Sequence, residues 1–207
     1  FLCLPDEAAR ESVTLAENEN TVIIDTSTAH RTEEGWAYGF PELSDAHKIA
    51  IEQGKRIAVP GCYATGFISL VYPLVTGGIL PKDYPVSSFA ISGYSGAGKK
   101  TIAVYECAER PKELSSGREY ALTQQHKHLK EMQKITGLAR TPLFSPIIDD
   151  YYSGMVVSVQ LYAELLAKKE TPESLLQYYA DYYKDKRFIR VSAADDETCL
   201  LYTSDAA

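Results

Sequence analysis

Short apolar runs alternate with amphipathic segments over the first 60 residues of the chain. Apolar residues recur at helical spacing over 6–17, which predicts a helix capped by Asp6. The continuous run "TVIID" (21–25) predicts a parallel strand covered on both faces, and "RIAVP" (56–60) predicts a second short strand. A further helix is predicted over 45–53. This alternation is typical of an α/β fold, in which ligands bind at the carboxyl ends of the strands.

A longer apolar helix is predicted to begin at Cys62 and to stop at the Gly77-Gly78 pair. Pro60 ends the strand before it, and Gly61 permits a tight turn because it has no Cβ. Cys62 therefore lies where a strand is followed directly by a helix. The apolar positions that define this helix are Phe67, Ile68, Leu70, Val71, Leu74 and Val75.

The pattern changes near Pro85, where longer strand-like runs replace the short ones. We place a domain change at residues 80–86 and interpret the second part as α+β, with helices on one side of a sheet. The predicted strands are 86–94, 154–162 and 187–192, and the predicted helices are 122–137 and 171–185. The tyrosine-rich helix 171–185 is interpreted as amphipathic packing, including packing against a partner subunit, rather than as a stacking platform for bases.

Composition and charge exclude several classes of function. The 207 residues are 45% hydrophobic and 24% charged, as in an ordinary globular protein. The net charge of −7 argues against a nucleic-acid partner, which needs a basic face, and gives no electrostatic reason to bind an anionic membrane. The four cysteines lie far apart without CxxC spacing, which predicts neither a metal site nor a disulfide framework. We therefore expect a cytoplasmic protein.

Both ends of the chain are expected to be incomplete. It opens without an initiator methionine inside "FLCLP" (1–5), which predicts the tail of a buried strand. The last nine residues, "CLLYTSDAA" (199–207), resemble the translated read-through of a sequencing adapter. We expect an incomplete reading frame with a non-native tail over 199–207, to which no function is assigned.

Cys62 is a candidate nucleophile. A thiol attacks as the thiolate, and a helix N-terminus stabilises an anion through its free N–H groups and its dipole. The same N–H groups could bind the oxyanion formed when a thiolate attacks a carbonyl. The alternative is that Cys62 is a small core residue, as free cysteines often are. Geometry alone leaves both interpretations open.

Five motifs in the same order resemble a known family. They are "DTSTAHRT" (25–32), "YGFPEL" (38–43), "VPGCYATG" (59–66), "SGYSGAGKK" (92–100) and "HKHLKEM" (126–132). Together they resemble the N-acetyl-γ-glutamyl-phosphate reductases of arginine biosynthesis, in particular the shorter sequence type, from residue 1 to about residue 192. Val59 stands where the family has Asn, and Ala64 and Lys130 stand where it has Pro.

The resemblance implies a fold and a domain division. Residues 1–84 would form a partial Rossmann-like NAD(P)-binding domain that lacks its N-terminal strands and glycine-rich turn and carries the nucleophile helix. Residues 85–198 would form a C-terminally truncated α+β catalytic and dimerisation domain of the semialdehyde dehydrogenase type. With half of the nucleotide-binding sheet missing, the fragment itself is expected to bind cofactor weakly or to be inactive.

The resemblance also implies an activity. It is the NADPH-dependent reduction of N-acetyl-γ-glutamyl phosphate to N-acetylglutamate semialdehyde, with release of phosphate, through a thioester on Cys62. The protein would be a homo-oligomer, a dimer or a tetramer. The alternatives are a reductase of aspartyl phosphate or of carrier-bound aminoadipyl phosphate, a thiol hydrolase, and a non-catalytic relative that keeps the fold.

His126 and His128 are the candidate acid–base residues that the resemblance supplies, because a histidine pKa lies close to working pH. Two residues apart on a helix, they would diverge by about 200°, so only one is expected to face the thiol. The sequence does not decide which of the two histidines faces the thiol. The alternative is that both lie on a solvated helix face. Glu131 is expected to orient a histidine or to contact the substrate.

The stretch "SGYSGAGKK" is expected to contact the acyl phosphate or the nicotinamide–ribose end of the cofactor. Its backbone N–H groups could form an anion-binding nest. Ser95 and Lys99 would bind substrate, and Gly93, Ser95 and Gly96 would bind cofactor. The alternative is an ordinary flexible turn.

The loop "DTSTAHRT" follows a predicted strand, where α/β folds place cofactor contacts. Ser27 and Thr28 are expected to hydrogen-bond the cofactor, and Arg31 to pair with an anionic group of the substrate. Pro5, in "LCLP", is expected to pack near the cofactor. The alternative is that Arg31 lies on the surface.

Overall fold

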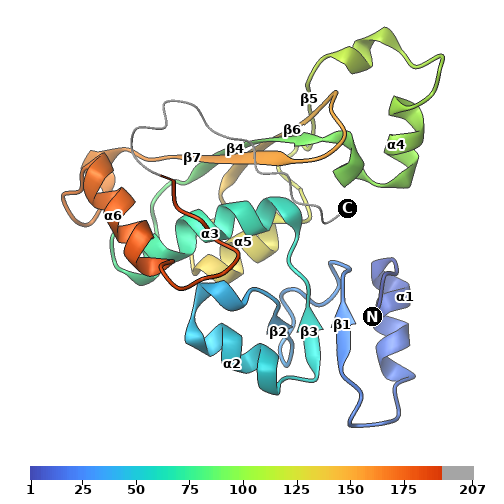
Figure 1. The fold of residues 1–207 in the computed structure, drawn as a ribbon, viewed down its shortest axis with the longest axis horizontal. Coiled ribbons are helices and arrows are strands. Elements are labelled where there is room, and N and C mark those ends of the chain that lie inside the picture. Colours follow the sequence, from blue (N-terminus) through green and yellow to red (C-terminus); the bar gives the residue numbers. More distant parts are fainter. Residues whose placement is uncertain (193–207) are drawn as a thin grey trace.

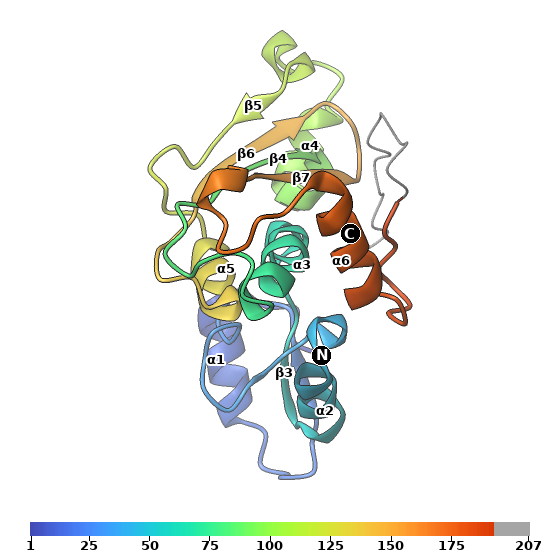
Figure 2. The same cartoon turned by 90° about the vertical axis from the view of Figure 1, so that its left-hand side faces the viewer.

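Two β-sheets with helices between them make up the fold (Figure 1). The computed structural model describes residues 1–192, so the predicted non-native tail 199–207 and the end of the segment 85–198 lie outside the described residues. In both ribbon views, α3 (Cys62–Thr76) and α5 (Leu129–Thr136) lie between the two sheets (Figure 2). This layered arrangement confirms the α/β class with an added α+β part.

The first sheet is parallel and has the order β1-β3-β2. Its strands are β1 (Ile23–Asp25), β2 (Ala37–Tyr38) and β3 (Arg56–Ala58), and Leu2 adds an isolated parallel bridge beside Asp25. The predicted strands in 21–25 and 56–60 are confirmed, with shorter bounds. The carboxyl ends of these strands meet at one edge, and the chain leaves β3 at that edge directly into α3.

Two helices accompany the first sheet, and one of them corrects the prediction. α2 (Asp45–Gln53) has the predicted bounds, with Ser44 as its N-cap. α1 (Asp6–Thr14) ends before the predicted Glu17, and Asp6 is not its cap. The carboxylate of Asp6 instead accepts hydrogen bonds from the N–H and hydroxyl of Thr28, so a tertiary contact replaces the local one.

The second sheet is mixed and has the order β5-β6-β4-β7. β4 (Ser87–Gly93) pairs with β6 (Leu143–Asp149) in parallel and with β7 (Met155–Gln160) antiparallel, and β5 (Arg118–Glu119) pairs with β6 antiparallel. β4 and β7 confirm two of the predicted strands. The remaining short elements are α4 (Lys99–Tyr105), η1 (Pro41–Leu43), η2 (Tyr94–Ala97), η3 (Lys112–Ser115) and η4 (Ala163–Leu165).

α3 is the centre of the hydrophobic core. It begins at Cys62 and is capped at its end by Gly77, as predicted. It packs against α5 and β7, and a Cβ at Gly66 would lie 2.7 Å from Val157 Cγ2. The absence of a side chain at Gly66 therefore sets how closely the helix approaches the sheet. Its fully buried side chains include Phe67, Ile68 and Val71, and each contributes about 1.5–3 kcal/mol on burial.

A row of tyrosines on α6 (Pro172–Tyr182) and at its C-cap holds the second half of α3. The hydroxyl of Tyr179 donates to Leu70 O at 2.5 Å, and that of Tyr183 donates to Ser69 O at 2.6 Å. Pro73 lies inside α3 and has no N–H, so Ser69 O lacks its usual helical donor. The Tyr183 hydroxyl supplies that missing donor. The predicted amphipathic packing is confirmed within the chain.

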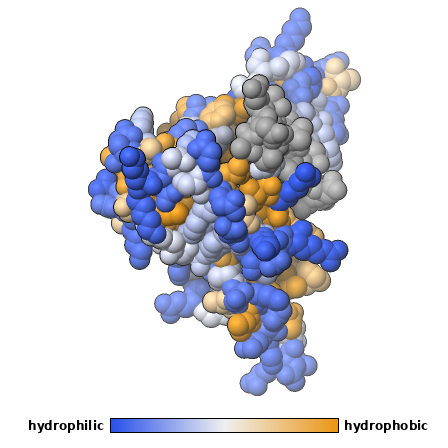
Figure 3. Space-filling view, turned by 60° about the vertical axis from the view of Figure 1, so that its left-hand side comes forward, coloured by the Kyte–Doolittle hydropathy of each residue, from blue (hydrophilic) through white to orange (hydrophobic). Residues whose placement is uncertain are grey.

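The face on which α6 lies is mostly polar, with smaller hydrophobic groups between the polar residues (Figure 3). Of the helices in residues 1–192, none combines the length and the apolar character needed to cross a membrane.

Two predicted elements are wrong. The helix predicted over 122–137 is formed only as α5, because Ala121 and Gln124 adopt positive φ angles of 55° and 57°. The Gln124 amide pairs with both backbone groups of Phe144 and so ties this segment to β6. The strand predicted over 187–192 is not formed, because no strand pairs with it in the described part of the chain.

Candidate active site

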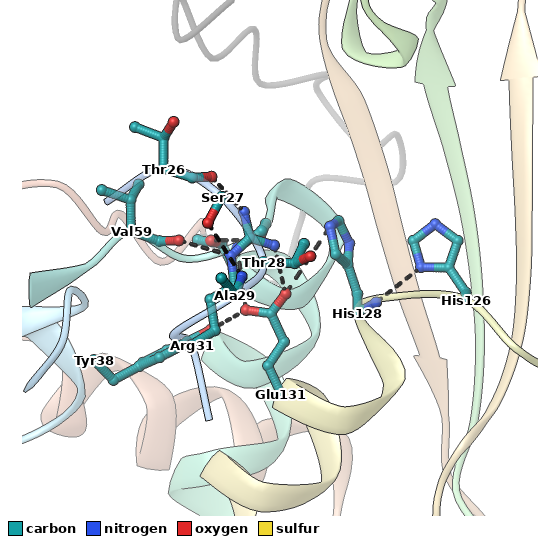
Figure 4. Close-up of polar contacts among 12 residues, drawn as sticks. Thr26, Ser27, Thr28, Ala29, Arg31, Tyr38, Val59, His126, His128 and Glu131 are labelled. Atoms are coloured by element: carbon teal, nitrogen blue, oxygen red, sulfur yellow. Dashed lines mark hydrogen bonds and ion pairs between the residues drawn. The ribbon is translucent and has the colours of Figure 1, made fainter. Parts of the chain in front are cut away.

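Three polar side chains, one from the loop after β1 and two from the start of α5, converge on Gly61, the residue before Cys62. A Cβ at Gly61 would overlap His128 Nε2 and Glu131 Oε1 and would lie 2.6 Å from Arg31 Nη1. Only glycine fits at this position. The start of α3, the loop after β1 and the start of α5 therefore meet at one point (Figure 4).

Glu131 is the hub of this cluster. Its side chain is 1% exposed and accepts hydrogen bonds from Arg31 Nη1 at 2.9 Å and from the Tyr38 hydroxyl at 2.9 Å. It also accepts one from the backbone N–H of Gly61 at 3.1 Å. A buried carboxylate is tolerated when it is paired and hydrogen-bonded in this way. Burial and the neighbouring Glu131 charge raise the pKa of Tyr38, so its hydroxyl stays a donor.

Arg31 is held inside the protein. Its Nε donates to Val59 O at 2.9 Å and its Nη2 donates to Thr26 O at 3.1 Å, in addition to the ion pair with Glu131. The anionic partner of Arg31 in this structure is thus a protein carboxylate. The alternative of a surface arginine is wrong, because the side chain is only 9% exposed.

The two histidines lie side by side, which corrects the prediction that they diverge on a helix. Both precede α5, and His128 is its N-cap residue. Their rings are 4.7 Å apart and edge to face, and both border the ring of Tyr63, at 5.8 Å and 5.9 Å. The backbone N–H of His128 donates to His126 Nδ1 at 3.1 Å. A neutral His126 therefore carries its proton on Nε2.

The surroundings of the histidines favour their neutral forms. Burial, together with His126, Arg31 and Lys127, lowers the pKa of His128 to about 2. Burial and the charge of Lys127 lower the pKa of His126 to about 4. His128 Nδ1 is buried and has no hydrogen-bond partner among residues 1–192.

Cys62 lies at the first position of α3 and is exposed. Loss of hydration on its protein side raises the pKa of the thiol, although the N–H groups of Tyr63 and Cys62 and the charges of Lys127 and Arg31 act in the opposite direction. The N–H groups at the helix N-terminus therefore favour the thiolate as expected, but burial outweighs them. The exposed sulfur also argues against the alternative of a core cysteine.

The stretch after β4 is used mainly for packing. The N–H groups of Gly93 and Ser95 donate to carbonyls of the turn at 151–154, and a Cβ at Gly93 would lie 2.6 Å from Tyr151 O. These N–H groups are therefore not free to form the predicted nest. Gly96 and Lys99 are exposed. Their predicted contacts with substrate and cofactor stay predictions.

The hydroxyls of the loop after β1 are engaged within the protein. Ser27 Oγ donates to Asp25 at 2.6 Å, and Thr28 donates to Asp6. Asp25 also contacts His30 Nδ1 at 2.6 Å, and burial would raise the pKa of this carboxyl, but the hydrogen bonds from Ser27 and His30 lower it. The predicted cofactor contacts of Ser27, Thr28 and the exposed N-cap residue Pro5 stay predictions.

Sequence reasoning missed several residues of the site. Tyr38 and Tyr63 lie inside quoted motifs, but no periodicity assigns them a partner across the fold. The Tyr63 hydroxyl lies 2.7 Å from Ser92 Oγ, which links the start of α3 to the end of β4. Lys127 is the third missed residue. Its position between two histidines in the sequence is the signal that could have identified it.

A cleft of about 600 Å³ opens beside the cluster, between α1, the loop after β1 and the segment before α5. Its lining is polar and includes His126, the basic residues Arg10, Arg31, Lys127 and Lys130, and the acidic residues Asp6, Glu33 and Glu131. Each of the three carboxylates already has a partner within the protein. A cleft of this size and character is suited to a small anionic molecule.

Comparison with known proteins places the chain among enzymes of one family. Residues 62–204 match the family model "Semialdehyde dehydrogenase, dimerisation domain". An N-acetyl-gamma-glutamyl-phosphate reductase of Trichormus variabilis is 42% identical over 204 residues, covering 97% of this chain and 63% of the relative. One of a Chelativorans species is 46% identical over 183 residues, covering 88% of this chain and 58% of the relative. The chain thus spans about three fifths of these relatives.

Solved structures share the fold. Aspartate semialdehyde dehydrogenase II of Vibrio cholerae aligns with a TM-score of 0.62 and 16% identity, over 84% of this chain and 57% of that one. Aspartate semialdehyde dehydrogenase with NADP from Candida albicans aligns with a TM-score of 0.56 and 14% identity, over 84% of this chain and 53% of that one.

Proposed function

Because this chain belongs to the semialdehyde dehydrogenase family, we propose that it is the catalytic part of an N-acetyl-γ-glutamyl-phosphate reductase. The reaction is the NADPH-dependent reduction of N-acetyl-γ-glutamyl phosphate to N-acetylglutamate semialdehyde and phosphate. Relatives of that name at 42% and 46% identity support this substrate. We include in the proposal a cytoplasmic location and assembly as a dimer or tetramer.

The observation that carries the proposal is the convergence on Gly61. Glu131 bonds the N–H of Gly61 and holds Arg31, and His128 Nε2 lies against the same glycine. An exposed thiol follows in the next residue. A nucleophile, a nitrogen base and an orienting carboxylate thus lie around the turn that precedes α3, as covalent acyl transfer requires.

The proton of the thiol must move when the sulfur attacks. In the unliganded site the thiol and both imidazoles are neutral, because the pKa of Cys62 is raised and those of the histidines are lowered. The hydrogen bond at His126 Nδ1 leaves that ring no free lone pair. We therefore assign the proton acceptor to His128, whose Nε2 adjoins the nucleophile helix.

Attack forms a bond from Cys62 Sγ to the acyl carbon and breaks the carbon–oxygen bond to phosphate. The sulfur proton passes to His128, and phosphate leaves with the electron pair. The N–H groups of Cys62 and Tyr63, which already favour the thiolate, would also stabilise the carbonyl oxygen as it becomes negative. An anion in the cleft would raise the pKa of both imidazoles, since an opposite charge stabilises the protonated ring.

NADPH would bind at the edge where the parallel strands of the first sheet end, as in other α/β folds. The backbone at Gly96 meets open space, and Thr28 lines the cleft beside Arg10. Pro5, Ser27, Thr28, Gly93, Ser95 and Gly96 are the residues that we propose to hold it. When bound, NADPH supplies the hydride that reduces the thioester to the aldehyde level.

The test uses the full-length protein and the reverse reaction, phosphate-dependent reduction of NADP⁺ by N-acetylglutamate semialdehyde. We expect activity in the native protein, loss of at least about 1,000-fold in Cys62→Ser, and weaker activity with aspartate semialdehyde. Thermal unfolding of Cys62→Ser provides the folding control. Higher activity with aspartate semialdehyde would reassign the substrate. Acyl-phosphate hydrolysis without NADPH would indicate a thiol hydrolase, and absence of activity in folded native protein a non-catalytic relative.

A further inference from the structure

The basic side chains that line the cleft differ in how many hydrogen bonds and ion pairs they already make within the protein. Arg10 donates to Ala29 O at 2.8 Å and lies 3.8 Å from Glu33, and Arg31 makes the three contacts described above. Lys127 and Lys130 also line the cleft and are exposed. Over residues 1–192, neither of these two ammonium groups has a hydrogen bond or ion pair. They are the cations that remain available to a ligand.

Of these two lysines, only Lys127 acts on the reacting groups. It lies between His126 and His128, whose rings are 4.7 Å apart and border the residue after Cys62. Its charge favours the thiolate of Cys62 and disfavours protonation of both imidazoles. Lys130 has no such effect on these groups.

We propose that Lys127 binds the phosphoryl group of the acyl phosphate, and inorganic phosphate in the reverse reaction. This inference rests on the proposed function and adds a substrate-binding residue to it. A lysine ammonium is a compact charge that suits a phosphate dianion. It takes part in no proton transfer: it holds the phosphate oxygens while the acyl carbon changes partner from oxygen to sulfur.

The proposal also explains how a buried, neutral site becomes reactive. Burial is the main cause of the low pKa values of the imidazoles, and the charge of a free Lys127 adds to it. A phosphoryl group on Lys127 compensates that charge, so His128 becomes a better proton acceptor only when substrate is present. The chemistry is thereby coupled to occupation of the cleft.

The experiment compares Lys127→Gln, Lys127→Arg and the matched Lys130→Gln in the full-length protein. The first measurement is the apparent KM for inorganic phosphate in the reverse reaction. We expect an increase of about tenfold or more in Lys127→Gln, because a charged hydrogen bond is lost. We expect partial recovery in Lys127→Arg and less than about a twofold change in Lys130→Gln.

The second measurement needs no turnover. Inorganic phosphate should protect Cys62 from alkylation by iodoacetamide, and Lys127→Gln should weaken this protection by a similar factor. Protection that depends on Lys127 in a protein without reductase activity would support the anion site and reject the proposed function. An unchanged phosphate KM in active Lys127→Gln would overturn the inference and leave the function standing. Lys99→Gln is measured in the same assay. An increase in the phosphate KM in that variant alone would overturn the inference and assign phosphate binding to the stretch after β4.

Discussion

The two ends of α3 are held by opposite kinds of contact. At the first turn, the N–H of Gly61 donates to the buried carboxylate of Glu131, and the side chains of Arg31 and His128 also lie against this glycine. In the second half, carbonyls accept hydrogen bonds from the hydroxyls of Tyr179 and Tyr183. The N–H of Gly61 and the carbonyl of Ser69 are backbone groups that the helix itself leaves without a partner, and Leu70 O gains an additional donor from Tyr179.

The difference separates a reactive end from a structural end. At the first turn the polar groups are not all satisfied, since His128 Nδ1 is buried without a partner in the described residues and the Cys62 thiol is open to solvent. In the second half each tyrosine hydroxyl has its acceptor. A core that fixes the far end of α3 allows an unsatisfied polar group to persist at the near end.

Gly61→Ala should have the largest effect, a loss of activity at the reactive end of α3. The added Cβ would overlap His128 Nε2 and Glu131 Oε1, so both groups must move away from the nucleophile. We expect reverse-reaction activity to fall roughly 100-fold or more, since misplacement by about 1 Å has that cost. Stability should fall by about 1–3 kcal/mol from overpacking, measured by urea unfolding.

Gly96→Ala is the stability control for this change. A Cβ at Gly96 meets nothing within 4 Å, so its free energy of unfolding should stay within about 0.5 kcal/mol of the native value. Native-like activity of Gly61→Ala would contradict the geometry that we assign to the site.

Acid should destabilise the reactive end and leave the tyrosine contacts intact. His128 has a pKa of about 2 in the folded protein against 6.5 for the free side chain, so the unfolded chain binds the extra proton. The stability that this histidine contributes is fully present above pH 6.5 and is lost as the pH falls below it. At pH 5 the loss should be on the order of 2 kcal/mol.

The measurement is urea unfolding at pH 7 and pH 5 for the native protein and for His128→Gln. The variant should lose less stability than the native protein between these two pH values. Equal losses in the two proteins would show that His128 is not held neutral by its surroundings.

Local sequence signals predicted the structural end better than the reactive end. The bounds of α2 and both ends of α3 follow from caps, glycines and apolar spacing, which act within a few residues. Cys62 was located for the same reason, because Pro60-Gly61 marks the change from strand to helix. These features need no knowledge of distant contacts.

The errors arose where tertiary contacts override local pattern. The segment before α5 reads as helix, but the Gln124 amide bonds the backbone of β6 and moves the start of the helix to Leu129. Because both histidines then precede the helix, the prediction that their side chains diverge was also wrong. The three donors on Glu131 come from positions 70–100 residues away, and no periodicity encodes such a pairing.

Tyr183→Phe should have the smallest effect, a modest loss of stability at the structural end of α3. Its hydroxyl replaces the helical donor that Pro73 removes from Ser69 O, so its loss should cost about 1 kcal/mol in urea unfolding. In a Pro73→Ala background the new N–H can donate to Ser69 O, and the cost of Tyr183→Phe should fall below about 0.5 kcal/mol. Tyr182→Phe is the matched control, because this hydroxyl donates to Leu43 O outside α3 and its cost should be the same in both backgrounds. Equal costs of Tyr183→Phe in the two backgrounds would show that this tyrosine packs against α3 without compensating for the proline.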